Sequence, residues 1–331
     1  MTLSKPRYFD DFSCIAGRCP DSCCKEWDVQ VDEASAALYR SLPGDLGDRL
    51  RQVLVEEDGE TLMLIEEGRC PMWRTDGLCR IQAELGEGAL CKTCREFPRL
   101  THDYGDFQER NLELSCPEAA RIILSAQPGW VSEEVPGGEE PEYDLDAMYT
   151  LKATREVVYK LLADASRPVA QNLALALIYG YQAQGQLDGN DPVPFDPESA
   201  MATVREFAKP GDMDALLAFF RDLEILNPNW LTRLDQPAPD SFDDRYRLLA
   251  RYFVDRYWLQ AVSDYDLSGR VKFMIISCLL IRHLGGDLAD TAQSYSKEIE
   301  NSAENLDAIL DAAYSHPAFT DDKLLGLLLH A

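Results

Sequence analysis

The sequence predicts a mainly α-helical protein, in which a small, irregular α+β cysteine-rich metal domain is followed by an all-helical domain. Nine of the ten cysteines lie between Cys14 and Cys116. Beyond residue 144 the apolar residues recur at helical spacing, without the alternation typical of strands. Residues 125–144 are rich in proline, glycine and carboxylates, which is typical of a linker or exposed loop. We therefore expect a metal domain over 1–124, a linker over 125–144 and a helical domain over 145–331.

In the cysteine-rich part the expected elements are short. Alternating apolar residues predict strands at 27–32, at 61–65 after the turn pair Asp58-Gly59, and at 107–114. Short helices are expected at 80–85, closed by Gly86, and at 87–94. So few elements bury little apolar area, so that bound metal would supply the missing stability.

The later part is expected to be helical throughout. Ser166 is expected to cap a helix with Pro168 in its first turn, and Ser268 another that ends at Gly285. The predicted helices span 144–163, 166–180, 213–226, 244–262 and 268–285, with two or three short helices after them. Cys278 lies in an apolar run of this part and is expected to be a buried, small apolar residue.

The charge of the chain indicates which partners to expect. It has 32 Lys and Arg against 58 Asp and Glu, a formal net charge of −26. Because phosphate binding needs clustered cations, we predict no nucleic-acid partner and no membrane partner. The first residues lack the apolar run of a signal peptide, and the longest apolar stretch, 273–281, is too short to span a bilayer. We expect a cytoplasmic protein, whose thiols stay reduced and available to metal.

The cysteine spacing predicts a metal site. The cysteines follow the pattern Cys14-x4-Cys19-x3-Cys23-Cys24, Cys70-x8-Cys79, Cys91-x2-Cys94 and Cys116. Thiolates bind zinc or anchor iron–sulfur clusters. One four-cysteine cluster and two sites that share eight cysteines both remain open. Nine buried cysteines that bind nothing are not expected, because no structural rule concentrates thiols in this way.

The choice between iron and zinc depends on the same spacing. Zinc modules usually show two separated C-x2-C pairs, whereas here only Cys91 and Cys94 have that spacing. The doublet Cys23-Cys24 is also unusual for a zinc ribbon. We therefore favour an iron–sulfur centre and keep zinc as the alternative.

Several motifs in a fixed order carry a resemblance over residues 8–120. They are Phe12-Ser13-Cys14, Cys19-Pro20-Asp21-Ser22-Cys23-Cys24, residues 27–32, Cys70-Pro71, Asp76-Gly77-Leu78-Cys79, Cys94-Arg95-Glu96-Phe97-Pro98-Arg99 and Ser115-Cys116-Pro117-Glu118. Together they resemble the flagellin lysine N-methylase family and its cysteine-cluster, zinc- or iron-chelating domain. The helical part is similar to the family only in outline, mainly at 252–258.

The resemblance implies an iron–sulfur protein lysine N-methyltransferase that uses S-adenosylmethionine and has flagellin as its protein substrate. The implied cofactor is a [4Fe–4S] cluster, with Zn²⁺ as the alternative. The ligands carried over from the family pattern are Cys14, Cys19, Cys23, Cys24, Cys70, Cys79, Cys94 and Cys116. Cys91 lies outside the most regular positions of that pattern. A non-catalytic interaction or redox module, stabilised by zinc or an iron–sulfur cluster, is the alternative function.

No residue identifies itself as catalytic. A lysine methylase must deprotonate an ammonium group with an ordinary pKa of about 10.4, and Tyr8, Asp28, Asp32 and Tyr104 lie near the cysteine segments but are expected to be structural. The spare metal ligand nearest in sequence would be His102.

Two arginines are the candidate cofactor-binding residues. Arg95 and Arg99 follow Cys94 in a chain that is short of cations. An arginine beside a cluster can donate hydrogen bonds to sulfur or to the carboxylate of a bound donor. The alternative for both is an ordinary ion pair with Glu96 or Asp103.

Overall fold

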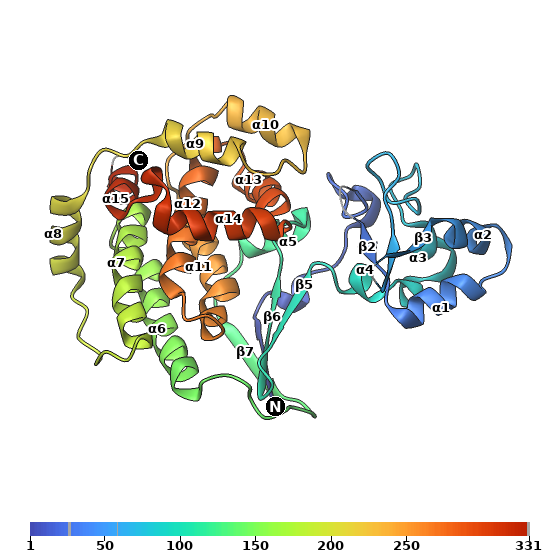
Figure 1. Ribbon diagram of the computed structural model, residues 1–331, viewed down its shortest axis with the longest axis horizontal. Helices are drawn as coiled ribbons and strands as arrows, with labels where there is room; N and C mark the ends of the chain where they lie inside the picture. Colours follow the sequence, from blue (N-terminus) through green and yellow to red (C-terminus); the bar gives the residue numbers. More distant parts are fainter. Residues whose placement is uncertain (26–27, 58, 330–331) are drawn as a thin grey trace.

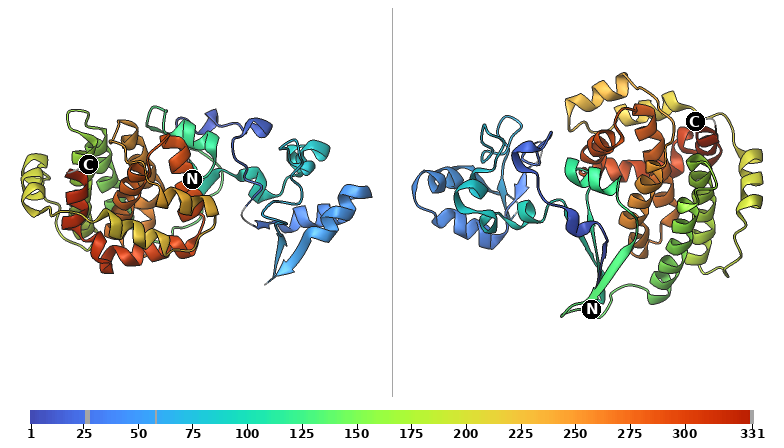
Figure 2. Two further views of the ribbon diagram at one scale, coloured as in Figure 1. Left: turned by 90° about the horizontal axis from the view of Figure 1, so that it is seen from above. Right: turned by 180° about the vertical axis from the view of Figure 1, so that it is seen from behind.

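The computed structural model describes residues 1–25, 28–57 and 59–329. It forms two lobes of unequal size, joined by extended segments (Figures 1 and 2). The chain starts in the larger lobe, passes into the smaller lobe through residues 13–25 and returns at residues 97–98. The predicted fold class is confirmed: the protein is mainly α, with a small α+β part.

The smaller lobe consists of short elements. They are β2 (Val29–Gln30), α1 (Glu33–Ser41), α2 (Gly44–Val53), β3 (Leu54–Glu57), β4 (Glu60–Met63), α3 (Arg80–Leu85) and α4 (Lys92–Glu96). The strands form an antiparallel sheet in the order β2-β4-β3. Its core contains Leu50, Met63 and Ile81, and the buried Cys70 and Cys91 are part of it.

The expected elements of this lobe are found with three differences. Trp27 and Asp58 lie outside the described residues, so the expected strand is seen only as β2, and the expected turn only through Gly59, with φ +86°. The single helix predicted over 87–94 is wrong. Instead a 3-10 turn (Glu87–Ala89) and α4 are separated by extended Leu90 and Cys91, and both of these residues are buried in the lobe's core.

The helices α1 and α2 were not predicted. A cap signal for α1 is present in the sequence, because the Asp32 carboxylate accepts a hydrogen bond from the Ser35 amide at 3.0 Å.

The larger lobe combines a four-stranded sheet with helices. Its elements are β1 (Thr2–Pro6), β5 (Arg99–Asp103), β6 (Phe107–Leu112), α5 (Pro117–Ile123), β7 (Trp130–Glu134), α6 (Leu145–Ala163), α7 (Val169–Leu187), α8 (Pro197–Phe207), α9 (Met213–Arg221), α10 (Pro228–Asp235), α11 (Arg245–Tyr257), α12 (Leu267–Leu284), α13 (Leu288–Tyr295), α14 (Ala303–Ser315) and α15 (Asp321–Leu329). The strand order is β5-β6-β1-β7, with β1 parallel to β6 and antiparallel to β7.

This sheet shares one core with the helices. Phe9, Leu112 and Leu114 are buried in the same cluster as Leu151 and Trp258. Strand β7 lies inside the segment 125–144, where a linker was predicted, and it pairs along the whole of β1. The predicted division into 1–124, 125–144 and 145–331 stays a prediction, but residues 2–12 and 99–134 contribute strands and core residues to the larger lobe.

The long helices of this lobe follow the sequence closely, with corrections at their ends. Helix α7 begins after Pro168 and not at Ser166, whose amide donates to Asp164. Helix α12 is capped by the Asp266 carboxylate and not by Ser268.

The helix predicted over 213–226 stops at Arg221. The Leu226 and Asn227 amides beyond it are bound by the carboxylate of Glu298 from another part of the chain, at 2.7 and 3.0 Å.

Helix α12 runs through the middle of the larger lobe (Figure 1). Nearly all its residues are buried, among them Cys278, which is fully buried as predicted. None of the helices in the described ranges combines the length and apolarity needed to cross a bilayer.

Candidate metal centre

A cavity of about 300 Å³ brings the nine N-terminal cysteines together. Every predicted ligand lines it, and so does Cys91. The thiols that line the cavity are Cys14, Cys19, Cys23, Cys24, Cys70, Cys79, Cys91, Cys94 and Cys116. In the described part of the chain, neither these cysteines nor Cys278 form a disulfide.

One group of these thiols lies where the chain passes between the lobes. Cys14 and Cys19 flank a 3-10 turn (Ala16–Arg18), in which the Ala16 amide donates to Cys14 Sγ at 3.4 Å. Cys116 stands at the start of α5. The pKa of Cys116 is raised to about 11, mainly by burial and also by the neighbouring Cys19 and Cys14. The pKa of Cys23 is raised by its hydrogen bond to Cys24, by burial, and then by its other thiol neighbours, Cys14 and Cys116 among them. Cys14, Cys19, Cys23 and Cys116 are therefore neighbours, which we call the junction thiols.

The other thiols, which we call the inner thiols, belong to the smaller lobe. They are Cys24, Cys70, Cys79, Cys91 and Cys94. The Cys70 amide donates to the Cys24 carbonyl at 2.7 Å, and Cys79 pairs with Trp73 in a β-bridge. The pKa of Cys70 is raised to about 12, mainly by burial and also by the nearby Cys24, Cys79 and Cys91.

Two of the inner thiols ionise easily. The pKa of Cys24 is lowered because it is hydrogen-bonded to Cys23, and the pKa of Cys91 is lowered because it is hydrogen-bonded to Cys94. The thiolate is the form that binds metal. Cys91, left outside the predicted ligand set, is thus as well placed as the others, and its signal in the sequence is the Cys91-x2-Cys94 spacing across the start of α4.

The cavity supplies the number and kind of donors that an iron–sulfur cluster or zinc requires. Among the described residues, no three or more His, Cys, Asp or Glu side chains are arranged to hold a metal ion as they stand. The fit therefore rests on the chemistry of nine thiols around one cavity, and not on a closed coordination shell.

Both candidate cofactor-binding arginines line the same cavity. Arg95 Nε lies 3.7 Å from Glu96 Oε1, so the predicted alternative of an ion pair with Glu96 applies to it. The Arg95 side chain is 43% exposed, which keeps this pair weak. The Arg99 guanidinium stacks on the Phe12 ring at 5.0 Å from its centroid. Both arginines thus line the cavity, and each also has a contact with a neighbouring residue.

The remaining candidates do not line this cavity. Asp32 caps α1 and also accepts from the Lys92 amide at 2.7 Å, and Asp28 accepts from the Ile65 amide at 2.7 Å. Tyr104 stacks on Phe107. These residues are structural.

His102 lies on β5, and its pKa is lowered to about 4 by burial and then by Arg256. It does not join the thiols.

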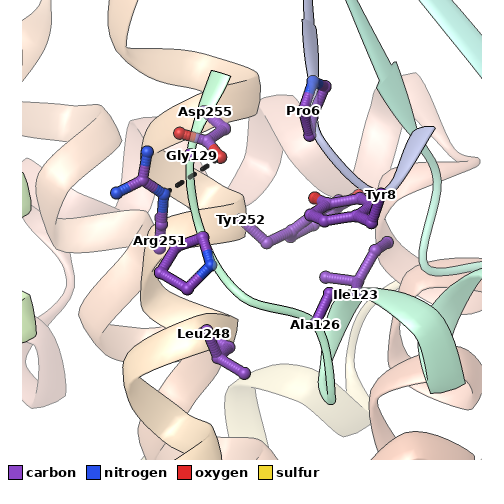
Figure 3. A pocket seen from close by; sticks show the side chains of 10 residues that line it. Pro6, Tyr8, Ile123, Ala126, Gly129, Leu248, Arg251, Tyr252 and Asp255 are labelled. Atoms are coloured by element: carbon purple, nitrogen blue, oxygen red, sulfur yellow. Dashed lines mark ion pairs between the residues drawn. The ribbon is translucent and has the colours of Figure 1, made fainter. Parts of the chain in front are cut away.

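A second hollow lies between β1, α5 and α11 (Figure 3). It encloses only about 10 Å³, room for about one water molecule. Tyr8 and Tyr252 both line it, and Arg251 forms an ion pair with Asp255 at 3.6 Å (Figure 3). Tyr8 is buried beside this ion pair, and the hollow is too small for a methyl donor.

The carboxyl of Asp255 in this network makes the stability depend on pH. Burial and the nearby Glu109 raise its pKa to about 6, although Arg251, a hydrogen bond from Tyr159, and Arg155 act to lower it. A folded-state pKa above the unfolded value means that the folded protein binds the proton more tightly. The contribution is therefore fully present below about pH 4 and is lost as the pH rises through about 6.

We expect Asp255→Asn to remove this dependence, because the amide stays neutral and can still accept from Tyr159. From pH 4 to pH 7 the wild type should lose about 2 kcal/mol relative to the variant. Urea unfolding of both proteins at the two pH values measures this. A difference in unfolding free energy that does not change with pH contradicts the prediction.

Known proteins match the sequence over part of its length. The flagellar biosynthetic protein FliU of Salmonella muenchen is 33% identical over 132 residues, which are 38% of this chain and 78% of that protein. The lysine-N-methylases of Salmonella choleraesuis and Salmonella typhimurium are also 33% identical over 132 residues, and the match spans 33% of their length. No family model matches the sequence. No solved structure matches it either.

Proposed function

The chain belongs to the flagellin lysine N-methylase family, and from this membership we propose that it is an iron–sulfur protein lysine N-methyltransferase. We further propose that it uses S-adenosylmethionine and that flagellin is its substrate. The observation that carries the proposal is one cavity lined by nine cysteines, none of them in a disulfide, together with Arg95 and Arg99.

The residues that would hold a [4Fe–4S] cluster are four of these nine thiols. A bound cluster would add a redox-active, electron-rich sulfur surface to the cavity wall. Hydrogen bonds from Cys23 and Cys94 lower the pKa of Cys24 and Cys91, which favours the thiolate form that binds metal.

The walls of the cavity suit both substrates of a methyl transfer. Arg95 and Arg99 would bind the carboxylate of a methyl donor, because a guanidinium donates two parallel hydrogen bonds to a carboxylate. Glu87 is the lining carboxylate that would attract the cationic sulfonium or the lysine side chain, because both oxygens of Glu118 already accept from Arg121.

The lysine must lose its proton before it reacts. Its free pKa of about 10.4 falls in an apolar environment such as the one beside Phe12, so that the ammonium releases its proton to solvent water. The amine lone pair then forms the bond to the methyl carbon, the carbon–sulfur bond breaks, and its electrons stay on the sulfur of the departing thioether.

Methyl transfer tests the proposal directly. Protein purified without oxygen is analysed for iron, sulfide and zinc, and is then incubated with flagellin and S-adenosylmethionine labelled in its methyl group. We expect iron and sulfide in equal amounts, visible absorption from the cluster, and label on flagellin lysines. Stoichiometric zinc without cluster absorption and without label transfer would instead support a zinc-stabilised interaction module.

A pair of cysteine variants tests whether the cavity is the metal site. We expect Cys116→Ala to lower the iron bound per chain after reconstitution, because Cys116 lines the cavity. Cys278→Ala, which also removes a buried thiol, should bind as much iron as the wild type, because Cys278 is enclosed by the helical core. Equal iron loss in both variants would show that the cavity is not the metal site.

A further inference from the structure

The loop between Cys19 and Cys23 is tied to the larger lobe through Asp21. Asp21 Oδ2 accepts hydrogen bonds from Gln293 Nε2 at 2.9 Å and from Lys297 Nζ at 3.0 Å. Gln293 is on α13, and Lys297 is on the π-helical turn that follows it (Ser296–Glu300). The loop is therefore anchored by residues more than two hundred positions later in the chain.

Gln293 also holds a second thiol-bearing segment. The same Nε2 donates to the carbonyl of Ser115 at 3.0 Å, and Ser115 directly precedes Cys116. Helices α5 and α13 are in contact, on the edge of the larger lobe that faces the smaller one (Figure 1). One side-chain amide thus joins the Cys19–Cys23 loop to the start of α5.

Charge and burial both strengthen these hydrogen bonds. Hydrogen bonds to a charged group are about twice as strong as neutral ones, and burial strengthens them further. The Asp21 and Lys297 side chains are only 20% and 14% exposed, and Gln293 is buried. Lys25, just after the loop, adds an ion pair to the other carboxylate oxygen of Asp21 at 2.6 Å.

The junction thiols need such an anchor. In the segment 14–24, all of it described, the only regular element is the 3-10 turn Ala16–Arg18. Neither Cys14 nor Cys23 belongs to a hydrophobic core cluster of the described residues, so core packing does not fix them. Ordering a segment of this kind costs about 1–2 kcal/mol per residue in backbone entropy.

We infer that Asp21, Gln293 and Lys297 form a latch through which the larger lobe positions Cys19 and Cys23 against Cys116. They are positioning residues, and the junction thiols are then a site that the smaller lobe does not complete alone. The role of the latch in metal binding rests on the proposed function, whereas its role in ordering the thiols does not.

Thiol reactivity in the metal-free protein tests the latch without any activity. Gln293→Leu removes both bridging hydrogen bonds. We expect iodoacetamide to alkylate Cys19, Cys23 and Cys116 on the order of tenfold faster in this variant, since the loss of a hydrogen bond to a charged group opens the site by about that factor. The rate at each cysteine is measured by mass spectrometry.

The matched control for this variant is Gln184→Leu. The Gln184 amide also ties two segments together, because it donates to the Tyr265 carbonyl at 2.8 Å and accepts from the Leu267 amide, but it does so far from the thiols. Its alkylation pattern should equal that of the wild type. Cys70, in the core of the smaller lobe, is the internal reference in both variants.

A second pair of variants removes a charge from the latch. Lys297→Met should give the same rise in alkylation, and Lys297→Arg, which keeps the cation, should restore the slower rates. Lys272→Met is the control, because it removes a buried lysine that pairs with Asp321 at 3.2 Å, away from the cavity. If circular dichroism shows that Gln293→Leu folds poorly, the Lys297 variants still test the latch.

Iron and sulfide per chain, measured after anaerobic reconstitution, complete the test. In the latch variants Gln293→Leu and Lys297→Met we expect less of both than in the controls. Faster alkylation in the latch variants, with a wild type that takes up no iron, would uphold the latch and overturn the proposed function. Wild-type alkylation rates and wild-type iron content in both latch variants would overturn the latch.

Discussion

Glu109→Ala should lower the free energy of unfolding by about 3–5 kcal/mol, because it leaves a buried arginine without its counter-charge. Arg155 on α6 donates to both carboxylate oxygens of Glu109 on β6, at 2.8 and 2.6 Å. The two side chains are 9% and 6% exposed. This pair links the four-stranded sheet to the helices, so its loss acts on the whole larger lobe.

The double variant Glu109→Met/Arg155→Met should lose far less stability than Glu109→Ala. Two apolar side chains of similar length carry no desolvation penalty, whereas one unpaired charge does. In the described structure Arg155 Nε has no hydrogen-bond partner, which adds to the cost that the apolar pair avoids.

Urea denaturation with matched substitutions measures these effects. Arg245 makes the same two-point contact with Asp243, but the side chains are 48% and 44% exposed. Arg245→Ala should therefore cost no more than about 1 kcal/mol. If Arg245→Ala and Glu109→Ala lower the free energy of unfolding equally, burial is not the cause of the stabilisation by the Glu109–Arg155 pair.

What the sequence predicts well is what depends on local spacing. Helix α6 was predicted to within a residue because an Asp cap precedes it and its apolar residues repeat along one face. The convergence of the cysteines was also predictable, because turns and doublets such as Cys23-Cys24 hold thiols close together along the chain.

What the sequence does not reveal is pairing between distant segments. Strand β1 pairs at Thr2 with Phe107 and with Glu134, and nothing in the local pattern of residues 2–6 specifies either partner. The segment that contains β7 was predicted as a linker because its prolines and glycines outweigh the short strand. The contact between Asp21 and Gln293 could not be predicted either, because the local sequence around a single Gln on a helix does not indicate its partner.

Metal removal is expected to have a large effect that is confined to the smaller lobe. Its apolar core is small, and Cys70 and Cys91 make up part of it. Domains of fewer than about 70–80 residues rarely gain more than about 3–5 kcal/mol from a single core, so that a structural metal often supplies the rest. The binding free energy of metal to thiolates then contributes directly to folding.

Differential scanning calorimetry should therefore show two transitions in the metal-loaded protein, and a chelator should shift only one. Where the metal contributes even about 2–3 kcal/mol, the melting temperature of the smaller lobe should fall by about 10 °C or more. The larger lobe is the internal control, because its core contains no predicted ligand except Cys116. This core also encloses Trp230 and Trp258, whose fluorescence reports the unfolding of the larger lobe. Two unchanged transitions would mean that the thiols hold no metal on which the fold depends. A shift of both would mean that the junction thiols couple the two lobes, as the latch at Asp21 requires if it transmits stability as well as position.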